Sequence, residues 1–392
     1  MRILFLSQLL PLPLDAGPKI RAFYVLRHLA EAGHAVTLLC FVRPSDRAED
    51  VHALSGFCRA VETVPMPRSR AKDLRAGLRS LVSDTPFLIL RDSVPAMYER
   101  LSRLSGNGEF DAVHADQLWM APYAARCASV PCRVLDQHNA VFRVPERLAD
   151  HQPHAVLRMI LRREARHLAS FEAAALDGFD RVAWVSDEDR RAFPARSPDR
   201  TARDHVIPIA VDPSARLPVE RAEPFRVTFL GGVHWPPNAE GVDWFAERVW
   251  PKVRRSAPNA VFTVIGKGAA RRLRTLPGVE PTGYVSDPGR YLAETAAFVV
   301  PLLTGAGMRV KILDAWCWGL PVVATSVGAE GIEAVHGGNL LIGDDEEAFA
   351  EGVVSVLKDA GRARLLGANG RATVVERYDW RKVYRAWDAI YH

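Results

Sequence analysis

The chain has 392 residues, of which 48% are hydrophobic and 25% are charged, and its formal net charge is +5. A chain of this length exceeds what one hydrophobic core usually serves, so we expect two domains. The composition excludes a disordered chain, and no apolar run reaches the roughly 18 residues that a transmembrane helix needs. Residues 1–212 carry 29 Lys and Arg against 26 Asp and Glu, and residues 213–392 carry 22 against 20, which is too even for a nucleic-acid-binding surface.

The five cysteines form no CxxC pair and have no histidine partners at zinc spacing. An odd number without a framework predicts a cytoplasmic protein without structural disulfides. Residues 1–10 could pass for a short signal peptide, but no small-residue cleavage site follows them. We therefore interpret this stretch as the first buried strand.

The amino-terminal half begins as strand, glycine loop, helix and strand. After residues 1–10, the turn at 11–21 contains Gly17, Lys19 and Arg21, a helix is predicted over 20–32, and an apolar strand over 35–42. This order is typical of half a nucleotide-binding domain, with its loop at the carboxyl end of the first strand.

Polar residues follow two further predicted strands, at 111–114 and 133–136. They are Asp116 and Gln117 in the first case, and His138 and Asn139 in the second. In an open parallel sheet, ligands bind at this edge. The alternative for His138 is a strand-end residue that only hydrogen bonds to the backbone.

Two predicted helices in this half, over 68–81 and 154–176, are strongly basic. Their cationic residues could simply face solvent, or they could contact anionic lipid headgroups or a lipid-linked substrate. The basic residues are Arg68, Arg70, Lys72, Arg75 and Arg79 in the first, and Arg158, Arg162, Arg163 and Arg166 in the second.

Four prolines between 208 and 224 indicate an interdomain linker. A second strand and glycine loop follow, over 225–230 with Gly231 and Gly232. Another strand, over 260–265, precedes a GxG that contains Lys267, and a turn at 283–287 precedes a short helix from 288 to about 295. The residues from 344 to 391 have a helical pattern.

The most informative stretch is 298–332. It predicts a buried strand ending at Leu303, a glycine turn at 304–307, a helix over 308–318 and a second strand over 321–325. A glycine turn that leads into a helix amino terminus can bind phosphate. Arg309 and Lys311 would face the phosphate, and Asp314 could accept hydrogen bonds from ribose hydroxyls. The alternative is an ordinary βαβ unit whose two basic residues point into water.

We therefore predict an α/β fold of two doubly wound, Rossmann-like domains that face each other across a cleft. The expected organisation is a first domain (1–205), a linker (206–224), a second domain (225–375) and a terminal helix (376–392).

Several segments resemble one family over nearly the whole chain. They include LPLDAGPKIRAFYVLRHLAEAGHAVTLL, DAVHADQLWMAPYA, LDQHN, FLGGVHWPPNAEGVDWF, PTGYVSD and GMRVKILDAWCWGLPVVATSVGAEGI. The chain resembles the retaining, GT-B-type glycosyl transferases group 1, or family 4. This resemblance implies a nucleotide-diphosphate sugar donor, no catalytic metal or other cofactor, and retained anomeric configuration. The acceptor would be a glycan, glycolipid or small-molecule natural product, as in bacterial glycoconjugate biosynthesis.

The resemblance also implies that the first domain binds the acceptor, that the second binds the nucleotide sugar and that the terminal helix returns to the first domain. It further implies roles for individual positions. Residues 307–311 match the segment that holds the donor diphosphate, Asp314 matches the ribose-binding acid, Gly17 approaches the phosphates, and 283–285 lie beside the nucleobase. The expected donor-binding set is Gly17, Gly231, Gly232, Lys267, Gly283, Val285, Gly307, Arg309, Lys311 and Asp314. The expected acceptor-binding set is Lys19, Arg21, Gln117, Asn139 and Arg143.

In the implied mechanism, Arg309 and Lys311 stabilise the departing nucleotide diphosphate, and a donor phosphate oxygen accepts the acceptor's proton. His138 or Asp116 would assist through hydrogen bonds. The protein would be cytoplasmic, and at the inner membrane face if its basic helices contact lipid.

Three positions depart from the family pattern. Ala306 replaces the first acid of a glutamate pair, Asp314 replaces the second, and residues 209–212 read IAVD instead of NGVD. A branch of the family with a glycine-rich turn and an Arg-x-Lys resembles this chain more closely. Two alternatives follow: a catalytically idle nucleotide-sugar-binding protein, or a GT-B epimerase or phosphorylase.

Overall fold

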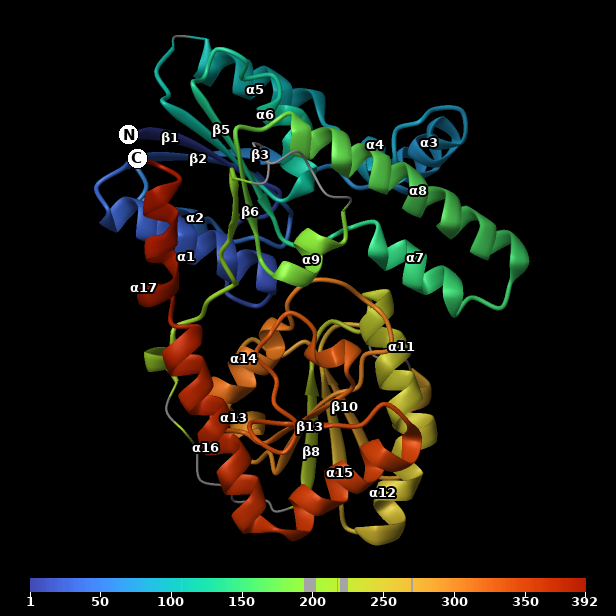
Figure 1. Ribbon diagram of the computed structural model, residues 1–392. Coiled ribbons are helices and arrows are strands. Elements are labelled where there is room, and N and C mark those ends of the chain that lie inside the picture. Colours follow the sequence, from blue (N-terminus) through green and yellow to red (C-terminus); the bar gives the residue numbers. More distant parts are fainter. Residues whose placement is uncertain (107, 194–201, 217, 219–224, 269–270) are drawn as a thin grey trace. The chain divides into compact units, whose positions relative to one another are not determined.

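The computed structural model describes residues 1–106, 108–193, 202–216, 218, 225–268 and 271–392. The chain forms two compact units, one of Met1–Ala210 with Trp380–His392 and the other of Val211–Asp379 (Figure 1). The first unit thus extends to 210, compared with the expected 205, and the chain returns to it at 380, compared with 376. Residues 217 and 219–224 of the predicted linker lie outside the described residues.

The first unit is built on a seven-stranded sheet of order β3-β2-β1-β4-β5-β6-β7, in which all neighbours are parallel. The register places Ser7 opposite Asp116, and Asp116 opposite Asp136, so polar side chains line up at the carboxyl edge. The strands are β1 (Arg2–Ser7), β2 (Ala35–Val42), β3 (Ala60–Pro65), β4 (Ala112–Asp116), β5 (Cys132–Gln137), β6 (Arg181–Trp184) and β7 (Asp204–Val206).

Helices cover both faces of this sheet, which explains why its strands are nearly continuous apolar runs. One apolar cluster includes α1 and another includes α5, α6 and α8. The helices are α1 (Gly17–Glu31), α2 (Ala48–Leu54), α3 (Arg70–Leu81), α4 (Phe87–Asp92), α5 (Pro95–Ser105), the turn η1 (Leu118–Met120), α6 (Ala121–Ala124), α7 (Arg143–Asp150), α8 (Ala155–Asp177) and α9 (Asp187–Arg191).

The carboxyl-terminal segment belongs to the core of the first unit. It consists of α17 (Trp380–Val383) and the turn η6 (Tyr384–Ala389), and it lies beside α1 (Figure 1). Four of its aromatic side chains, at 380, 384, 387 and 391, are buried in the same apolar cluster as α1. Their spacing places them on one face of a helix.

The second unit is built on a six-stranded parallel sheet of order β10-β9-β8-β11-β12-β13. Two parallel sheets with this type of strand order confirm the prediction of two Rossmann-like domains. The strands are β8 (Arg226–Leu230), β9 (Val261–Ile265), β10 (Val279–Gly283), β11 (Ala297–Val300), β12 (Val322–Ala324) and β13 (Leu341–Ile342).

The helices of the second unit surround its sheet, and α16 packs closely on α14. A Cβ atom at Gly370 of α16 would lie 2.2 Å from Cδ1 of Trp316, so only glycine permits this approach. The helices and turns are η2 (Pro213–Ala215), α11 (Pro236–Trp244), η3 (Phe245–Val249), α12 (Trp250–Ser256), η4 (Arg271–Thr275), α13 (Gly289–Ala293), α14 (Val310–Cys317), η5 (Val327–Ala329), α15 (Glu346–Lys358) and α16 (Ala360–Arg377).

Candidate functional site

Each sheet has one point where its strand order reverses, between β1 and β4 in the first unit and between β8 and β11 in the second. In doubly wound sheets, ligands bind outside the carboxyl ends of the strands at this point. Most of the site residues predicted from the sequence follow the strands next to these two points. The two units therefore offer two candidate sites.

In the second unit, backbone hydrogen bonds draw three glycine loops together at the carboxyl edge. The amide of Gly231 donates to the Ile265 carbonyl at 2.9 Å, and the amide of Gly266 donates to the Gly283 carbonyl at 2.9 Å. A Cβ atom at Gly266 would lie 2.0 Å from the Gly231 carbonyl oxygen. Glycine is therefore required where these loops meet.

The predicted donor residues Gly232, Lys267 and Val285 lie on these same loops. The amide of Val233, next to Gly232, donates to the Lys267 carbonyl at 2.7 Å. The ammonium group of Lys267 lies 4.6 Å from the ring centre of Tyr284, which is half-exposed beside Val285. The structure thus brings the predicted loop residues of the second unit to one edge of its sheet.

Lys311, in the first turn of α14, extends its ammonium group to the glycine loop after β8. Its Nζ donates to Oδ1 of Asn238 at 2.8 Å and lies 4.4 Å from the ring centre of Phe229. The amide of Asn238 in turn donates to the Gly232 carbonyl at 2.9 Å. A Cβ atom at Gly231 would lie 2.9 Å from Nζ, so the loop backbone closely approaches this cation.

No carboxylate lies within 4.0 Å of the Lys311 ammonium among the described residues. Burial, together with the nearby guanidinium of Arg309, lowers the pKa of Lys311 to about 7. A cation at the mouth of a glycine loop without a carboxylate partner is suited to binding an anion.

Arg309 occupies a different environment from the one expected. Its guanidinium is largely buried and donates to the carbonyls of Ala306 at 2.7 Å, Gly307 at 2.9 Å and Val327 at 3.1 Å. Gly307 has a φ of +78°, a left-handed conformation that turns its own carbonyl toward this side chain. Arg309 therefore holds the turn before α14 in shape, and direct contact with phosphate stays a prediction.

Asp314 lies one turn after Lys311 on α14 and is partly buried. Burial raises the pKa of Asp314, and the positive charge of Arg216 opposes that shift. Because α14 rises about 1.5 Å per residue, a diphosphate bound at Lys311 would place its nucleoside within reach of the Asp314 carboxylate. Its ribose-binding role stays a prediction.

The turn around Ala306 has no acidic side chain of its own, but α11 brings one to it. Oε2 of Glu240 accepts a hydrogen bond from the buried hydroxyl of Thr304 at 2.6 Å. Sequence reasoning did not single out Glu240 or Asn238, although both lie in the segment FLGGVHWPPNAEGVDWF that resembles the family. The sequence does not indicate that Asn238 contacts Lys311 or that Glu240 contacts Thr304.

The buried polar cluster of the first unit contains Arg21, Asp116, Asp136 and His138. Arg21 and Asp136 are fully buried and form a bidentate pair, with Nη2 to Oδ1 at 2.6 Å and Nε to Oδ2 at 2.7 Å. Nη1 of Arg21 also donates to the Ile207 carbonyl at 2.7 Å. The prediction that Arg21 binds the acceptor is therefore wrong, because a guanidinium with no exposed surface holds the core of the unit together.

His138 lies next to this pair, at the end of β5. Its Nε2 is 2.9 Å from Oδ1 of Asp116 and 3.4 Å from Oδ2 of Asp136. The hydroxyl of Ser7 donates to the other oxygen of Asp116 at 2.8 Å. Burial alone would lower the pKa of His138, but the carboxylates of Asp116 and Asp136 outweigh it and raise that pKa.

The alternative that His138 only hydrogen bonds to the backbone is not what the structure shows, since its partners are two carboxylates. Its Nδ1 is buried and makes no hydrogen bond within the described part of the chain. A buried donor without a partner is costly, so this nitrogen is a candidate contact for a ligand hydroxyl.

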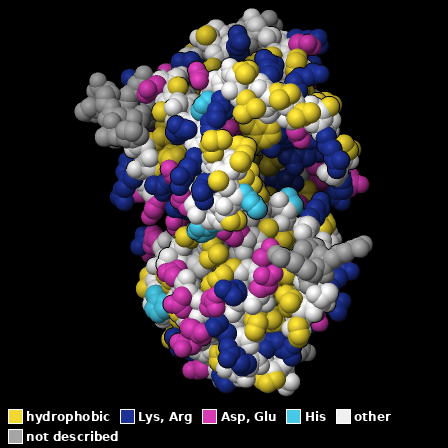
Figure 2. Space-filling view, turned by 90° about the vertical axis from the view of Figure 1, so that its right-hand side faces the viewer, with side chains coloured by type: hydrophobic (Ala, Val, Ile, Leu, Met, Phe, Trp, Pro, Cys, Tyr) yellow, Lys and Arg dark blue, Asp and Glu magenta, His cyan; other side chains and the backbone are white. Residues whose placement is uncertain are grey.

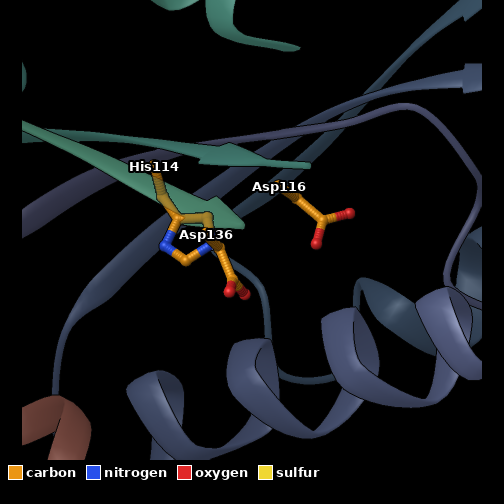
Figure 3. A group of neighbouring side chains, drawn as sticks. All are labelled: His114, Asp116 and Asp136. Carbon is orange, nitrogen blue, oxygen red and sulfur yellow. The ribbon is translucent and has the colours of Figure 1, made fainter. Parts of the chain in front are cut away.

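His114 joins the same cluster from β4, and Figure 3 shows it beside Asp136, with Asp116 on the same strand. Its Nδ1 lies 2.6 Å from the Tyr391 hydroxyl, and its ring stacks on Phe5 at 4.1 Å. His114, Asp116 and Asp136 have potential metal-ligand atoms within 4.8 Å of one another. However, the guanidinium of Arg21 already binds both oxygens of Asp136, so this donor set fits a metal ion poorly.

Gln117 follows β4 with a φ of +73°, the one residue other than glycine with a positive φ in the described chain. Its side-chain Nε2 is buried and has no hydrogen-bond partner in the described part of the chain. A strained backbone that presents a polar group at the ligand-binding edge is typical of a functional position. The acceptor-binding role of Gln117 stays a prediction.

The loop after β5 is held in place by Glu172 of α8. Its carboxylate accepts hydrogen bonds from the amides of Val141 at 2.8 Å and Phe142 at 2.9 Å, and from Nε2 of Gln137 at 2.7 Å. Burial raises the pKa of Glu172 to about 8. This residue was missed because nothing in the sequence distinguishes it from other acids of an amphipathic helix.

The remaining predicted residues lie at the same edge with fewer contacts. Gly17 begins α1, and Lys19 in the same first turn pairs with Asp15 at 3.0 Å. Asn139 and Arg143 are partly exposed around the loop that Glu172 holds. No predicted role for these four residues is tested by the contacts of the described chain.

Comparison with known proteins supports the sequence-based resemblance. Residues 224–359, in the second unit, match the family model described as Glycosyl transferases group 1. A Klebsiella pneumoniae protein described as "Uncharacterized 44.6 kDa protein in cps region" is 30% identical over 175 residues, or 40% of this chain and 44% of that protein. The chain thus aligns with less than half the length of that relative.

A longer match is to a GDP-mannose-dependent alpha-(1-6)-phosphatidylinositol monomannoside mannosyltransferase of Mycolicibacterium smegmatis. It is 24% identical over 338 residues, or 79% of this chain and 83% of the relative. Among solved structures, Anabaena HepE in complex with UDP and glucose has a TM-score of 0.69 at 14% identity, covering 99% of this chain and 98% of that one. The second unit thus matches the model of the predicted family, and the structural match confirms the predicted fold of two Rossmann-like domains.

Proposed function

We propose that this chain, which carries a glycosyl transferases group 1 domain in a GT-B fold, transfers a sugar from a nucleotide-diphosphate sugar to an acceptor hydroxyl. The observation that carries the proposal is the Lys311 ammonium, which lies against the glycine loop after β8 with an amide oxygen as its hydrogen-bond partner. A diphosphate placed there would supply the negative charge that this buried cation lacks.

The donor would be held by the edge of the second sheet. Lys311 and loop amides near Gly231 would bind the diphosphate, and the first turn of α14 would add the positive end of its helix dipole. Arg309 would act indirectly by fixing the turn at 304–307. Asp314 would accept hydrogen bonds from the ribose hydroxyls.

In the proposed reaction, the bond between the anomeric carbon and the diphosphate oxygen breaks, and the acceptor oxygen bonds to the same carbon. The acceptor's proton passes to an oxygen of the departing diphosphate, which leaves with both electrons of the broken bond. Lys311 stabilises the charge that develops on this leaving group. Attack from the face that the diphosphate leaves would retain the anomeric configuration.

The first unit would bind the acceptor through the edge that carries His138 and Gln117. The carboxylates of Asp116 and Asp136 raise the pKa of His138, which favours a role as hydrogen-bond donor over one as general base. Its unpartnered Nδ1 and the Gln117 amide are both suited to acceptor oxygens. The donor nucleotides named for the relatives are GDP and UDP, so both are the first candidates for the base.

A direct assay tests the proposal. Purified protein is given GDP- and UDP-sugars with and without lipid extracts and glycans as acceptors, and released nucleotide diphosphate is measured. We expect release that depends on the acceptor, and an anomeric NMR spectrum of the product that shows retention.

The matched control is Lys358→Met, at an exposed position of α15, compared with Lys311→Met. The idle-protein alternative predicts tight nucleotide binding without release under any condition. An epimerase or phosphorylase would instead turn over the donor without an acceptor hydroxyl, by isomerising it or by using inorganic phosphate.

A further inference from the structure

The first unit exposes a concentrated set of large apolar side chains. Among the described residues, 17 large hydrophobic side chains are exposed, and eight of them fall within residues 74–82 and 156–160. Such clustering marks an interaction surface, whereas single exposed apolar residues are ordinary. The eight, which we call the α3/α8 apolar face, are Leu74, Leu78, Leu81, Val82, Val156, Leu157, Met159 and Ile160.

On α3, the exposed leucines follow a helical repeat. Leu74, Leu78 and Leu81 are 66%, 59% and 58% exposed, and their spacing places them along one side of the helix. The buried residues of α3 are Ala76 and Ser80, on its opposite side. The helix therefore packs on the unit through its small residues and turns its leucines outward, the reverse of an ordinary surface helix.

The two helices form one continuous surface. Nη2 of Arg163 on α8 donates to the carbonyls of Leu81 at 3.2 Å and Ser83 at 3.4 Å, which joins α8 to the end of α3. Met159 and Ile160 lie one turn before Arg163 and are 64% and 47% exposed. Figure 1 shows α3 and the first turns of α8 on the same side of the unit.

Cations surround this apolar face. Residues 68–82 and 154–166 together contain nine Lys and Arg but two acids, a larger positive excess than the +5 of the whole chain. One of the acids, Glu164, accepts hydrogen bonds from the amides of Phe87 and Leu88. Figure 2 looks onto this side and shows apolar side chains interleaved with Lys and Arg.

We infer that the α3/α8 apolar face binds the surface of an anionic lipid bilayer. Basic residues would contact lipid headgroups, while the leucines, Met159 and Ile160 would enter the boundary with the acyl chains. No described helix has the length and apolar character to cross a bilayer, so the contact would be peripheral. A protein partner is less well matched, because interfaces between proteins are enriched in aromatic residues and none of the eight exposed side chains is aromatic.

The inference does not depend on sugar transfer, although a membrane surface would suit a lipid-linked acceptor of the proposed reaction. The test is sedimentation of the full chain, without any donor, with phosphatidylcholine vesicles that contain or lack phosphatidylglycerol. We expect binding to the anionic vesicles, loss of binding at high salt, and at least about tenfold weaker binding to neutral vesicles.

Two variants separate the apolar and the basic contributions. Leu74→Gln with Leu78→Gln should weaken anionic-vesicle binding about tenfold or more, and so should Arg75→Gln with Arg79→Gln. The matched controls are Leu365→Gln, 59% exposed on α16, and Arg255→Gln with Arg362→Gln, both exposed on the second unit. These controls should bind like the unmodified chain.

Several outcomes would overturn the inference. They are absence of anionic-vesicle binding by the unmodified chain, equal binding by the α3 variants and the controls, and a leucine variant that changes oligomeric state in size-exclusion chromatography but binds vesicles normally. Circular dichroism and nucleotide binding by each variant verify that it is folded. Because these readouts do not require turnover, failure here would leave the proposed transferase activity intact.

Discussion

Two buried basic side chains, Arg21 of the first unit and Lys311 of the second, have opposite environments. In the first unit, Arg21 makes a bidentate pair with Asp136, and the neighbouring His138 lies between two carboxylates. In the second, Lys311 lies against an amide oxygen and an aromatic ring, and burial lowers its pKa to about 7. The charge of Arg21 is balanced within the protein, and this pair stabilises the fold of the first unit. The charge of Lys311 is not balanced by a carboxylate, so a negatively charged ligand would stabilise it.

This contrast is useful because both sets occupy equivalent places, at the carboxyl edge of a doubly wound sheet beside its reversal of strand order. Position in the fold alone would assign both to ligand binding. The partners of each cation distinguish a structural pair from a binding residue. Four measurements test whether the distinction holds.

The largest effect, on the free energy of unfolding, should come from removing the carboxylate of the Arg21–Asp136 pair. Asp136→Asn leaves the guanidinium of Arg21 buried without its carboxylate, so we expect a loss of about 3–5 kcal/mol in the free energy of unfolding. Urea denaturation monitored by tryptophan fluorescence measures it. The control is Asp111→Asn, which breaks the exposed pair with Arg2 and should cost no more than about 1 kcal/mol. Equal losses in the two variants would contradict a structural role for the buried pair.

Removing the cation of Lys311, which has no carboxylate partner among the described residues, should affect binding and spare the fold. We expect Lys311→Met to weaken nucleotide-diphosphate binding by about 2–4 kcal/mol, since it removes a charge donor at the phosphate. Stability without ligand should be unchanged or higher, because a buried ammonium is replaced by an apolar side chain. Calorimetric titration measures binding, and Lys358→Met serves as the surface control. Unchanged affinity would place the phosphate elsewhere.

A third measurement tests whether the carboxylate of Asp314 binds the ribose of the nucleotide. If it binds the ribose, Asp314→Asn should lose about 1.5–3 kcal/mol of nucleotide affinity for each hydrogen bond, whereas Asp314→Glu should keep most of it. A dideoxy nucleotide should bind the unmodified chain and Asp314→Asn about equally. If Asp314→Asn binds the intact nucleotide as tightly as the unmodified chain does, the ribose assignment fails.

The smallest effect is a pH dependence that only the second unit should show. The pKa of Lys311 is about 7 without ligand, and a bound diphosphate would raise it, so binding takes up a proton above that pH. Nucleotide affinity should therefore fall as pH rises from 7 toward 9, by at most about tenfold per pH unit. Lys311→Met should remove this slope. A slope that persists in Lys311→Met would assign the proton to another group.

The sequence predicted the fold well because local patterns determine it. Apolar runs for buried strands, glycines after them and a helix after each loop placed β1, β2, β8, β11 and α14 close to their observed bounds. The expectation that Lys311 lies in the first turn of a helix that follows a glycine turn came from the same pattern. Its partner Asn238 could not be identified, because it lies 73 residues away and only the tertiary fold joins the two.

Arg21 shows where such reasoning ends. A basic residue after a glycine loop has the pattern of a ligand contact, and the sequence gives no hint that Asp136, 115 residues later, captures it. The environment of Arg309 could not be predicted from the sequence either, because it depends on where the carbonyls of one short turn point. For α3, the exposure of the leucines could not be predicted, because it depends on which side of the helix packs on the rest of the unit.

The carboxyl-terminal segment has a consequence for how the chain is made. Tyr391 contacts His114 in the middle of the first sheet, and Trp380, Tyr384 and Trp387 fill the core beside α1. A ribosome must therefore translate the chain as far as Tyr391 before the amino-terminal unit can acquire these core residues, although the second unit, whose residues are contiguous, can fold earlier. An isolated fragment of residues 1–210 would expose the surface that these aromatic rings cover, and it should aggregate unless a peptide of residues 380–392 is supplied.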